Sequence, residues 1–255
     1  MPQLKDQVVV VTGGTSGIGR DVVTLLRAQG AQVALIARNP QKGKVVADET
    51  GAHLFVADLQ DEEAISRAFR GIEEQYKRID GLVANAGVGV AEGLVHMLPS
   101  QTWDHVENTD LRGTFLTTKE ALIRMVKQRS GSIVCVSSVV AHASILGVGS
   151  AYAAAKGAIE SFSRSIAVDY GKFGIRCNVV APGATDTPMM WVNVPPEQIR
   201  DVEATLNAVV PLGRLGKPAE IARGIIWLLS DEAEYVTGAT LVIDGGVTAK
   251  SVLPA

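Results

Sequence analysis

The sequence predicts a single doubly wound α/β domain, with a parallel sheet of about seven strands and helices on both faces. Three observations lead to this prediction. The 255 residues are 47% hydrophobic and 20% charged, which suits one large domain with a substantial core. Short β-rich runs recur along the chain, and segments with helical spacing separate them. Strands that are apolar on both faces and alternate with helices indicate a parallel sheet covered on both sides.

The predicted strands are short runs of mostly branched apolar residues. They lie at residues 8–11, 33–36, 54–56, 82–84, 133–136, 177–180 and 241–243. Apolar residues in two of the intervening segments follow helical spacing: Ile18, Val22, Leu25 and Leu26, and then Ile221, Ile225, Leu228 and Leu229. We therefore expect residues 1–255 to form one domain in which strands and helices alternate; two small domains are the alternative.

Residues 189–212 break this alternation. The stretch contains Pro195-Pro196 in an irregular pattern, and it is too long for an ordinary connection. It follows the end of a predicted strand, and open α/β sheets bind ligands outside the carboxyl ends of their strands. We expect this stretch to be a lid over a binding site.

Composition narrows the possible partners and compartment. The formal net charge of -3 gives no general attraction toward nucleic acid or an anionic membrane. No apolar stretch is long enough to span a bilayer, and residues 1–11 lack the arrangement of a signal peptide, so we expect a cytoplasmic protein. Cys135 and Cys177 lie in apolar runs typical of buried thiols. The histidines show no metal-ligand spacing, so no metal site is predicted.

A glycine-rich turn directly follows the first predicted strand and opens the first helix. Its glycines permit a tight turn and let the backbone approach a pyrophosphate, which the amides of a helix N-terminus hold. An ordinary strand-to-helix turn also contains one or two glycines, but the strand-turn-helix context favours a dinucleotide site of the Rossmann type. The residues expected to contact the cofactor here are Gly13, Thr15, Ser16, Gly17, Ile18 and Gly19.

The end of the second predicted strand bears on which dinucleotide binds. A site that prefers NAD usually has Asp or Glu there, to accept a hydrogen bond from the ribose 2′-hydroxyl. This sequence has Arg38-Asn39 instead, and Arg38 is suited to a 2′-phosphate. NADP(H) is therefore favoured, although a solvated surface arginine and NAD(H) binding are the alternatives.

Tyr152 and Lys156 lie four residues apart in an alanine-rich helical segment, so their side chains share one helix face. An ammonium beside a phenol stabilises its ionised form, which a general acid/base requires. The preceding strand ends at Ser137-Ser138, whose hydroxyls emerge at the ligand-binding edge of the sheet. Together these residues predict proton-transfer chemistry beside the dinucleotide.

These motifs stand in a characteristic order, which gives the chain a resemblance to the short-chain dehydrogenase/reductase family along almost its whole length. The motifs are Thr12-Gly13-x-x-x-Gly17-x-Gly19, Asp58-Leu59, Asn85-Ala86-Gly87, Ser138, Tyr152-x-x-x-Lys156 and Pro182-Gly183-x-x-x-Thr187. The resemblance implies that Tyr152 exchanges a proton with the substrate, that Ser138 steadies the substrate oxygen, and that Lys156 binds the nicotinamide ribose.

The same resemblance implies further cofactor contacts. Asp58 and Leu59 are expected near the adenine, and Asn85, Ala86 and Gly87 along the cofactor crevice. The contacts expected at the nicotinamide end are Pro182, Gly183, Thr185 and Thr187. The family also implies a homotetramer, a dimer of dimers that pairs helices near residues 113–127 and 150–169 with those of a second copy.

Two features depart from the usual family pattern. Ser138 precedes Tyr152 by fourteen residues, one more than the common spacing, and Ser137 or Ser144 are alternatives to it. Aligned on Gly113, Asp110 stands where the family usually has an asparagine that resembles a water-holding link to the lysine. A buried Asp110 anion costs free energy unless Lys156 or water compensates. We expect a working enzyme with an altered relay; the alternative is a solvent-facing Asp110 with Asn108 in its place.

The substrate contacts are predicted from position alone. His142 and Ser144 lie between the serine and tyrosine motifs, a region that resembles a substrate wall in the family, although an exposed loop histidine is an equal alternative. Met189 and Trp191 begin the expected lid and are either an apolar substrate cover or packing residues. Ser138 and Tyr152 complete the predicted substrate contacts.

The predicted activity is NADP(H)-dependent reduction of a small or cyclic ketone to a secondary alcohol, with Tyr152 as general acid/base. The nearest rival is an NAD(H)-dependent alcohol or hydroxysteroid dehydrogenase. A rival of another class is a non-catalytic dinucleotide-binding sensor or scaffold.

Overall fold

Seven parallel strands form one sheet in the computed structural model, which describes residues 4–89, 93–143 and 149–250. The strands are β1 (Val8–Thr12), β2 (Gln32–Ala37), β3 (His53–Val56), β4 (Gly81–Ala84), β5 (Gly131–Val136), β6 (Ile175–Pro182) and β7 (Thr240–Ile243). Their order is β3-β2-β1-β4-β5-β6-β7, so the chain reverses its direction of travel across the sheet between β1 and β4. The predicted doubly wound fold is confirmed, and ligands bind such folds at this reversal.

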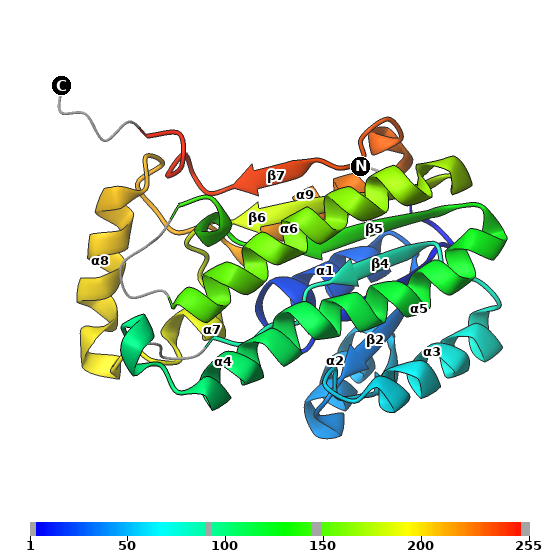
Figure 1. Ribbon diagram of the computed structural model, residues 1–255, viewed down its shortest axis with the longest axis horizontal. Helices are drawn as coiled ribbons and strands as arrows, with labels where there is room; N and C mark the ends of the chain where they lie inside the picture. The colour runs from blue at the N-terminus through cyan, green and yellow to red at the C-terminus, as the bar shows by residue number, and fades with distance from the viewer. Residues whose placement is uncertain (1–3, 90–92, 144–148, 251–255) are drawn as a thin grey trace.

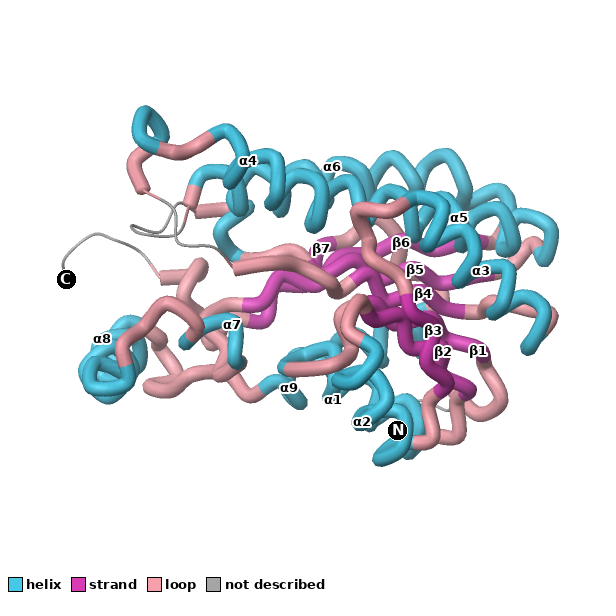
Figure 2. The backbone as a smooth tube through the Cα atoms, turned by 90° about the horizontal axis from the view of Figure 1, so that it is seen from below, coloured by secondary structure: helices cyan, strands magenta, loops and turns pink. Residues whose placement is uncertain are grey.

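Helices cover both faces of the sheet (Figures 1 and 2). Figure 2 shows one layer formed by α1 (Gly17–Ala28), α2 (Pro40–Thr50) and α9 (Pro218–Leu229). The opposite layer consists of α3 (Glu62–Tyr76), α4 (Ser100–Val106), α5 (Gly113–Gln128) and α6 (Ser150–Tyr170). Each layer encloses its own apolar core against the sheet, because every buried strand presents side chains to both faces.

Short-range signals account for where several helices begin and end. Asn39 Oδ1 accepts from the Lys42 amide at 2.9 Å and so caps α2, while Asp61 Oδ1 accepts from the Ala64 amide at 3.0 Å and caps α3. Helix α2 ends at Gly51, which has the left-handed conformation that glycine adopts readily. These local signals determine where α2 and α3 begin and where α2 ends.

Strand β5 shows how the sheet delivers side chains to both layers. Ile133 and Cys135 pack into the core beneath α3, α5 and α6, whereas Val134 and Val136 pack into the core beneath α1 and α9. Cys135 and Cys177 are free and buried, as the sequence predicts. Ser137 and Ser138 follow at the carboxyl end of the strand.

The predicted lid region contains two helices rather than an irregular loop. They are α7 (Pro188–Trp191) and α8 (Ile199–Val209), joined through a 3-10 turn η5 (Pro196–Gln198). Figure 1 shows α8 at one end of the molecule, away from the sheet. The other short turns are η1 (Val95–Met97), η3 (Val139–Ala141), η4 (Gly171–Phe173) and η6 (Asp231–Ala233). Within the described residues, no helix combines the length and apolar character needed to cross a membrane.

Candidate active site

The turn between β1 and α1 is shaped to accept an anionic diphosphate. Gly13 has φ +67°, and a Cβ atom there would lie 2.7 Å from Ala86 Cα, so a side chain has no room. Gly17 has φ +51° and lies against Thr187. In this fully described turn, Ser16 begins α1 without a side-chain cap, and the first turn of α1 has no acidic residue. The helix amides and the positive end of its dipole are therefore available to an anion.

Thr12 and Asn85 join this turn to the loop after β4. The Thr12 hydroxyl accepts hydrogen bonds from the amides of Asn85 and Ala86, both at 3.1 Å. Asn85 Nδ2 in turn donates to the carbonyl oxygens of Thr12 and Gly13, at 3.1 and 3.2 Å. Gly19 lies behind the turn, where a Cβ atom would come within 2.4 Å of Asn85 Nδ2. The two loops at the sheet's reversal point therefore form one polar unit.

A cavity of about 390 Å³ lies along these loops. Many of the predicted cofactor contacts line it: Gly13, Thr15, Ser16, Gly17, Ile18, Arg38, Asp58, Leu59, Asn85, Ala86, Gly87 and Thr187. Met189, predicted to contact substrate, lines it as well. Sequence reasoning overlooked other lining residues: Ile36, Ala37, Asn39, Lys42, Ala57, Val88, Thr109 and Pro188. The elongated set spans the ends of β1, β2, β3 and β4, which fits a dinucleotide.

Two cations stand in the part of this cavity formed by β2 and α2. Arg38 follows β2 and its side chain is 64% exposed; Arg38 Nη1 lies 3.9 Å from Asp58 Oδ2. Lys42 lies in the first turn of α2 and lines the same cavity. Arg38 precedes Asn39, the N-cap of α2, so the two cations do not share a helix face and helical spacing gave no signal for Lys42.

Tyr152, Lys156 and Asp110 come together in three dimensions. Lys156 Nζ lies 5.2 Å from the centre of the Tyr152 ring and 3.1 Å from Asp110 Oδ2. Asp110 is fully buried, and Lys156 is 3% exposed. Asp110 Oδ1 also accepts from the Val88 amide at 2.9 Å. The alternative of a solvent-facing Asp110 is therefore excluded, and Lys156 compensates the buried anion.

Opposing effects act on the Lys156 ammonium. Burial lowers the pKa of Lys156, but the charges of Asp110 and Tyr152 and a hydrogen bond to Asp110 outweigh it and raise this pKa above its ordinary value. The pKa of the neighbouring Glu107 is also raised. Burial is the larger cause, and the Asp110 charge adds to it. Gly87 leaves room for the pair, because a Cβ atom there would lie 2.8 Å from Asp110 Oδ2.

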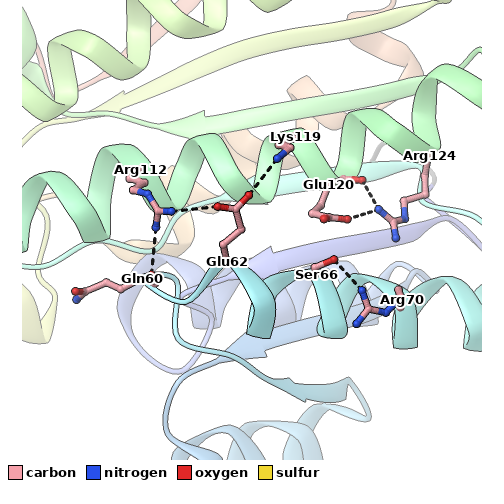
Figure 3. A network of polar contacts seen from close by, with 8 residues as sticks. All are labelled: Gln60, Glu62, Ser66, Arg70, Arg112, Lys119, Glu120 and Arg124. Atoms are coloured by element: carbon pink, nitrogen blue, oxygen red, sulfur yellow. Dashed lines mark hydrogen bonds and ion pairs between the residues drawn. The ribbon is translucent and has the colours of Figure 1, made fainter.

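Asp110 belongs to a π-helical turn, η2 (Glu107–Arg112), between α4 and α5. Such turns are rare and often occur at functional sites. Gln60 Nε2 donates to Thr109 Oγ1 at 3.0 Å, and Arg112 donates to the Gln60 carbonyl at 3.2 Å and to Glu62 at 3.1 Å. Figure 3 shows Glu62 reaching both Arg112 and Lys119. The loop after β3 is thereby fastened to the turn that carries Asp110.

Ser138 lies between β5 and the turn η3. Its Oγ accepts a hydrogen bond from the Val140 amide at 3.4 Å. Lys156 Nζ donates to the Val136 carbonyl at 3.3 Å, and Ser137 Oγ donates to the Lys156 carbonyl at 3.1 Å. The strand end that carries Ser138 is thus bound to the turn of α6 that carries Lys156. His142 Nε2 lies 2.9 Å from Glu160 Oε1, a contact that sequence reasoning missed. Ser144 lies outside the described residues.

The motif after β6 is only partly assembled around the cavity. Thr187 lines it, whereas Pro182 pairs with Ile243 of β7 and Gly183 lies against Asp244. Thr185 Oγ1 donates to the Gly183 carbonyl at 2.9 Å. Trp191 Nε1 donates to Asp186 Oδ1 at 2.7 Å, which fixes the indole at the start of the lid region.

Among the residues that the structure describes, no group of three His, Cys, Asp or Glu side chains is placed to hold a metal ion.

A family model described as enoyl-(acyl carrier protein) reductase matches residues 13–248. Cis-4-hydroxycyclohexanecarboxylate dehydrogenase from Sinomonas cyclohexanicum is 38% identical, with 96% of this chain and 97% of that protein covered. A protein named inactive 2-(S)-hydroxypropyl-CoM dehydrogenase 2, from Xanthobacter autotrophicus, is 41% identical over 86% of this chain and 96% of its own length. The crystal structure of levodione reductase superimposes with a TM-score of 0.93 at 36% identity, covering 98% of this chain and all of that one.

Proposed function

We propose that this chain, which belongs to the short-chain dehydrogenase/reductase family, is an NADP(H)-dependent oxidoreductase that reversibly reduces a small or cyclic ketone to a secondary alcohol. The observation that carries the proposal is the convergence of Tyr152, Lys156 and Asp110 beside a cavity suited to a dinucleotide. A buried, perturbed cation next to a phenol in a cleft is typical of a catalytic site.

The proton-transfer step is assigned to Tyr152. In the reducing direction its hydroxyl gives a proton to the carbonyl oxygen, while Ser138 donates a hydrogen bond to the same oxygen and stabilises its developing charge. The Lys156 ammonium, 5.2 Å from the ring centre, stabilises the phenolate that remains. The bound nicotinamide supplies the hydride in this direction and accepts it in the other.

The described residues fit a nicotinamide dinucleotide along the whole cavity. The glycine turn and the amides of α1 would hold the diphosphate, and Asp58 and Leu59 would border the adenine. Asn85 to Gly87 would line the middle and Thr187 the nicotinamide end, and Lys156, which lies behind Gly87 rather than on the cavity lining, would bind the nicotinamide ribose. We assign Pro182, Gly183 and Thr185 to shaping the strand end behind Thr187.

We propose that Asp110 raises the pKa of Lys156. An asparagine at this position would instead hold a relay water through its amide. Its carboxylate contacts Lys156 Nζ directly at 3.1 Å and lacks the donor that an asparagine would provide. The anion keeps Lys156 protonated to higher pH, but it also offsets part of the positive charge that Tyr152 experiences. The result is an active enzyme with an altered relay.

The preference for NADP(H) rests on charge. Arg38 and Lys42 both line the cavity, and a ribose 2′-phosphate between them would gain charge-assisted hydrogen bonds. The observation that favours NAD(H) instead is Asp58, which lies 3.9 Å from Arg38 and would repel a phosphate. Two cations outweigh one carboxylate that Arg38 already pairs with, so NADP(H) remains our choice.

The substrate class is drawn from the relatives and from the lid. Two of the three proteins compared above are named for a hydroxycyclohexane carboxylate and for levodione, and the third, named inactive, for hydroxypropyl-CoM. In this chain, Met189 at the cavity and the exposed Val192 and Leu212 give the lid region an apolar character, which suits a cyclic ketone. His142 is held by Glu160 and would border the substrate from the opposite side.

We also propose a cytoplasmic homotetramer. The free, buried Cys135 and Cys177 are suited to a reducing compartment. Between α5 and α6 lies an apolar groove of about 830 Å³, lined by Phe115, Leu122, Ile123, Val126, Phe162 and Ile166, among others. Phe115 and Ile123 are each 44% exposed, and a second copy of the chain is the proposed occupant of this groove.

A non-catalytic dinucleotide-binding protein is the rival of another class. Two observations favour it. Asp110 stands where the family usually has an asparagine, and the relative from Xanthobacter autotrophicus is named inactive. The assembled Tyr152 and Lys156, with Ser138 at the neighbouring strand end, favour catalysis, because a sensor has no need of a proton donor at the nicotinamide.

The first prediction concerns Tyr152. In a screen of NADPH oxidation with cyclic ketones, quinones and ketoacyl esters, we expect turnover of at least one cyclic ketone. Tyr152→Phe should lower kcat on that ketone by about 10²-fold or more, because the proton donor is lost, and should leave NADPH affinity within twofold. Tyr235→Phe, at a fully exposed position, serves as the control. Full turnover by Tyr152→Phe would remove Tyr152 from the chemistry.

The second prediction concerns cofactor choice. Arg38→Ala should raise the KM for NADPH by about tenfold to a hundredfold, through loss of a charge-assisted contact of about 1.5–3 kcal/mol. The KM for NADH should stay within twofold. Arg70→Ala is a matched control, because Arg70 is exposed, donates a hydrogen bond to Ser66 on the same helix and does not line the cavity. Equal effects on both cofactors would contradict a 2′-phosphate contact.

The third prediction concerns Asp110→Asn. Removing the anion lets burial lower the pKa of Lys156, so the ammonium is lost at lower pH. The alkaline limb of the kcat/KM profile should therefore move to lower pH, while kcat near pH 7 stays unchanged or rises. Asp104→Asn, on the exposed face of α4, should move neither. Abolished activity in Asp110→Asn would contradict the tuning role.

The fourth prediction concerns assembly. Phe115→Asp places a charge in the apolar groove and should reduce the tetramer to a smaller species, measured by sedimentation velocity at micromolar concentration. Tyr235→Asp is the control for adding a surface charge. A wild-type protein that sediments as a monomer would overturn the proposed interface.

A further inference from the structure

The helix face that carries Tyr152 and Lys156 continues to a third polar residue. Glu160 follows Lys156 by four residues, as Lys156 follows Tyr152, so the three recur on one face of α6. Glu160 is only 6% exposed and does not line the cavity. A buried carboxylate costs free energy unless it is well compensated, and the proton transfer assigned to Tyr152 does not use it.

The contacts of Glu160 bracket Ser138. The single proton of the Ser137 hydroxyl has two acceptors within reach, Glu160 Oε1 at 3.0 Å and the Lys156 carbonyl at 3.1 Å, and His142 Nε2 lies 2.9 Å from the same Glu160 oxygen. Ser137 immediately precedes Ser138, and His142 ends the turn η3 that Ser138 begins. Both ends of the short segment that presents the Ser138 hydroxyl are therefore attached to one atom of α6.

This arrangement relates two parts of the site that come from different elements. Tyr152 and Lys156 are placed by α6, whereas Ser138 is placed by the end of β5. The contacts of Lys156 with Val136 and Ser137 hold the strand end before Ser138, and those of Glu160 reach past it to His142. A hydroxyl that must share a substrate oxygen with a phenol needs its position held to within a fraction of an ångström.

We infer that Glu160 is a positioning residue that, through Ser137 and His142, holds Ser138 in register with Tyr152 for the proposed ketone reduction. The inference rests on the proposed function and assigns Glu160 no contact with substrate or cofactor. His142 contributes to the substrate wall because Glu160 orients its ring.

Variants of Glu160 test the inference by separating kcat from cofactor binding. Glu160→Ala should lower kcat by about tenfold to a hundredfold and leave the KM for NADPH within twofold. Glu160→Gln keeps an oxygen that accepts from Ser137 and His142, and it should restore most of the turnover. Arg164→Ala, one turn further along α6 and exposed, is the matched control and should retain wild-type kcat.

A double-mutant cycle with Ser138→Ala shows whether Glu160 acts through Ser138. Ser138→Ala alone should lower kcat by about 10²-fold. Glu160→Ala added to it should lower kcat less than twofold further, because the hydroxyl to be positioned is already absent. His142→Ala, at a partly exposed residue that tolerates truncation, should lower kcat a few-fold and show the same non-additivity. If Glu160→Ala does not fold, the cycle of His142→Ala with Ser138→Ala still tests the inference.

The outcomes separate this inference from the proposed function. Full additivity of the Glu160 and Ser138 substitutions overturns the inference, and so does a Glu160→Ala enzyme with wild-type kcat while Tyr152→Phe is inactive. A raised NADPH KM together with lowered kcat also overturns it, since that indicates general damage to the fold. Unimpaired turnover by Tyr152→Phe instead overturns the proposed function.

Discussion

The buried ammonium of Lys156 is the group on which the arrangement of this site depends. An isolated ammonium inside a protein is strongly disfavoured, so the surrounding elements must supply its compensation. Asp110 provides the opposite charge at 3.1 Å and Val136 a carbonyl oxygen at 3.3 Å. These partners come from the turn η2 and from β5, so satisfying one cation draws three segments together at the carboxyl edge of the sheet.

Polar contacts between loops connect the rest of the carboxyl edge of the sheet. Thr12 and Asn85 join the glycine turn to the loop after β4, and Gln60 and Arg112 join the loop after β3 to η2. All of these contacts link residues more than forty positions apart in the chain. Such connected hydrogen bonds make the cavity walls rigid, and a rigid wall holds reacting groups with little loss of conformational entropy when ligands bind.

Asp110 is the buried anion that compensates the Lys156 cation. Its carboxylate stabilises the protonated form of Lys156. The same carboxylate also places a negative charge near the Tyr152 phenol. In the proposed reaction, the balance between these two effects sets the pH range in which the pair works. Glu160, on the same face of α6 as Lys156, is another buried acidic group, and it contacts the Ser138 segment instead of the lysine side chain.

Much of this structure was predictable because its signals are local. Strand runs, the glycine turn and the four-residue spacing of Tyr152 and Lys156 follow from the periods of strands and helices, which neighbouring residues determine. The environment of Asp110, the attachment of His142 to Glu160, and the exclusion of Thr185 from the cavity were not predictable in this way. They depend on which loops the strand order brings together, and on burial, which only the packed sheet and its helix layers decide.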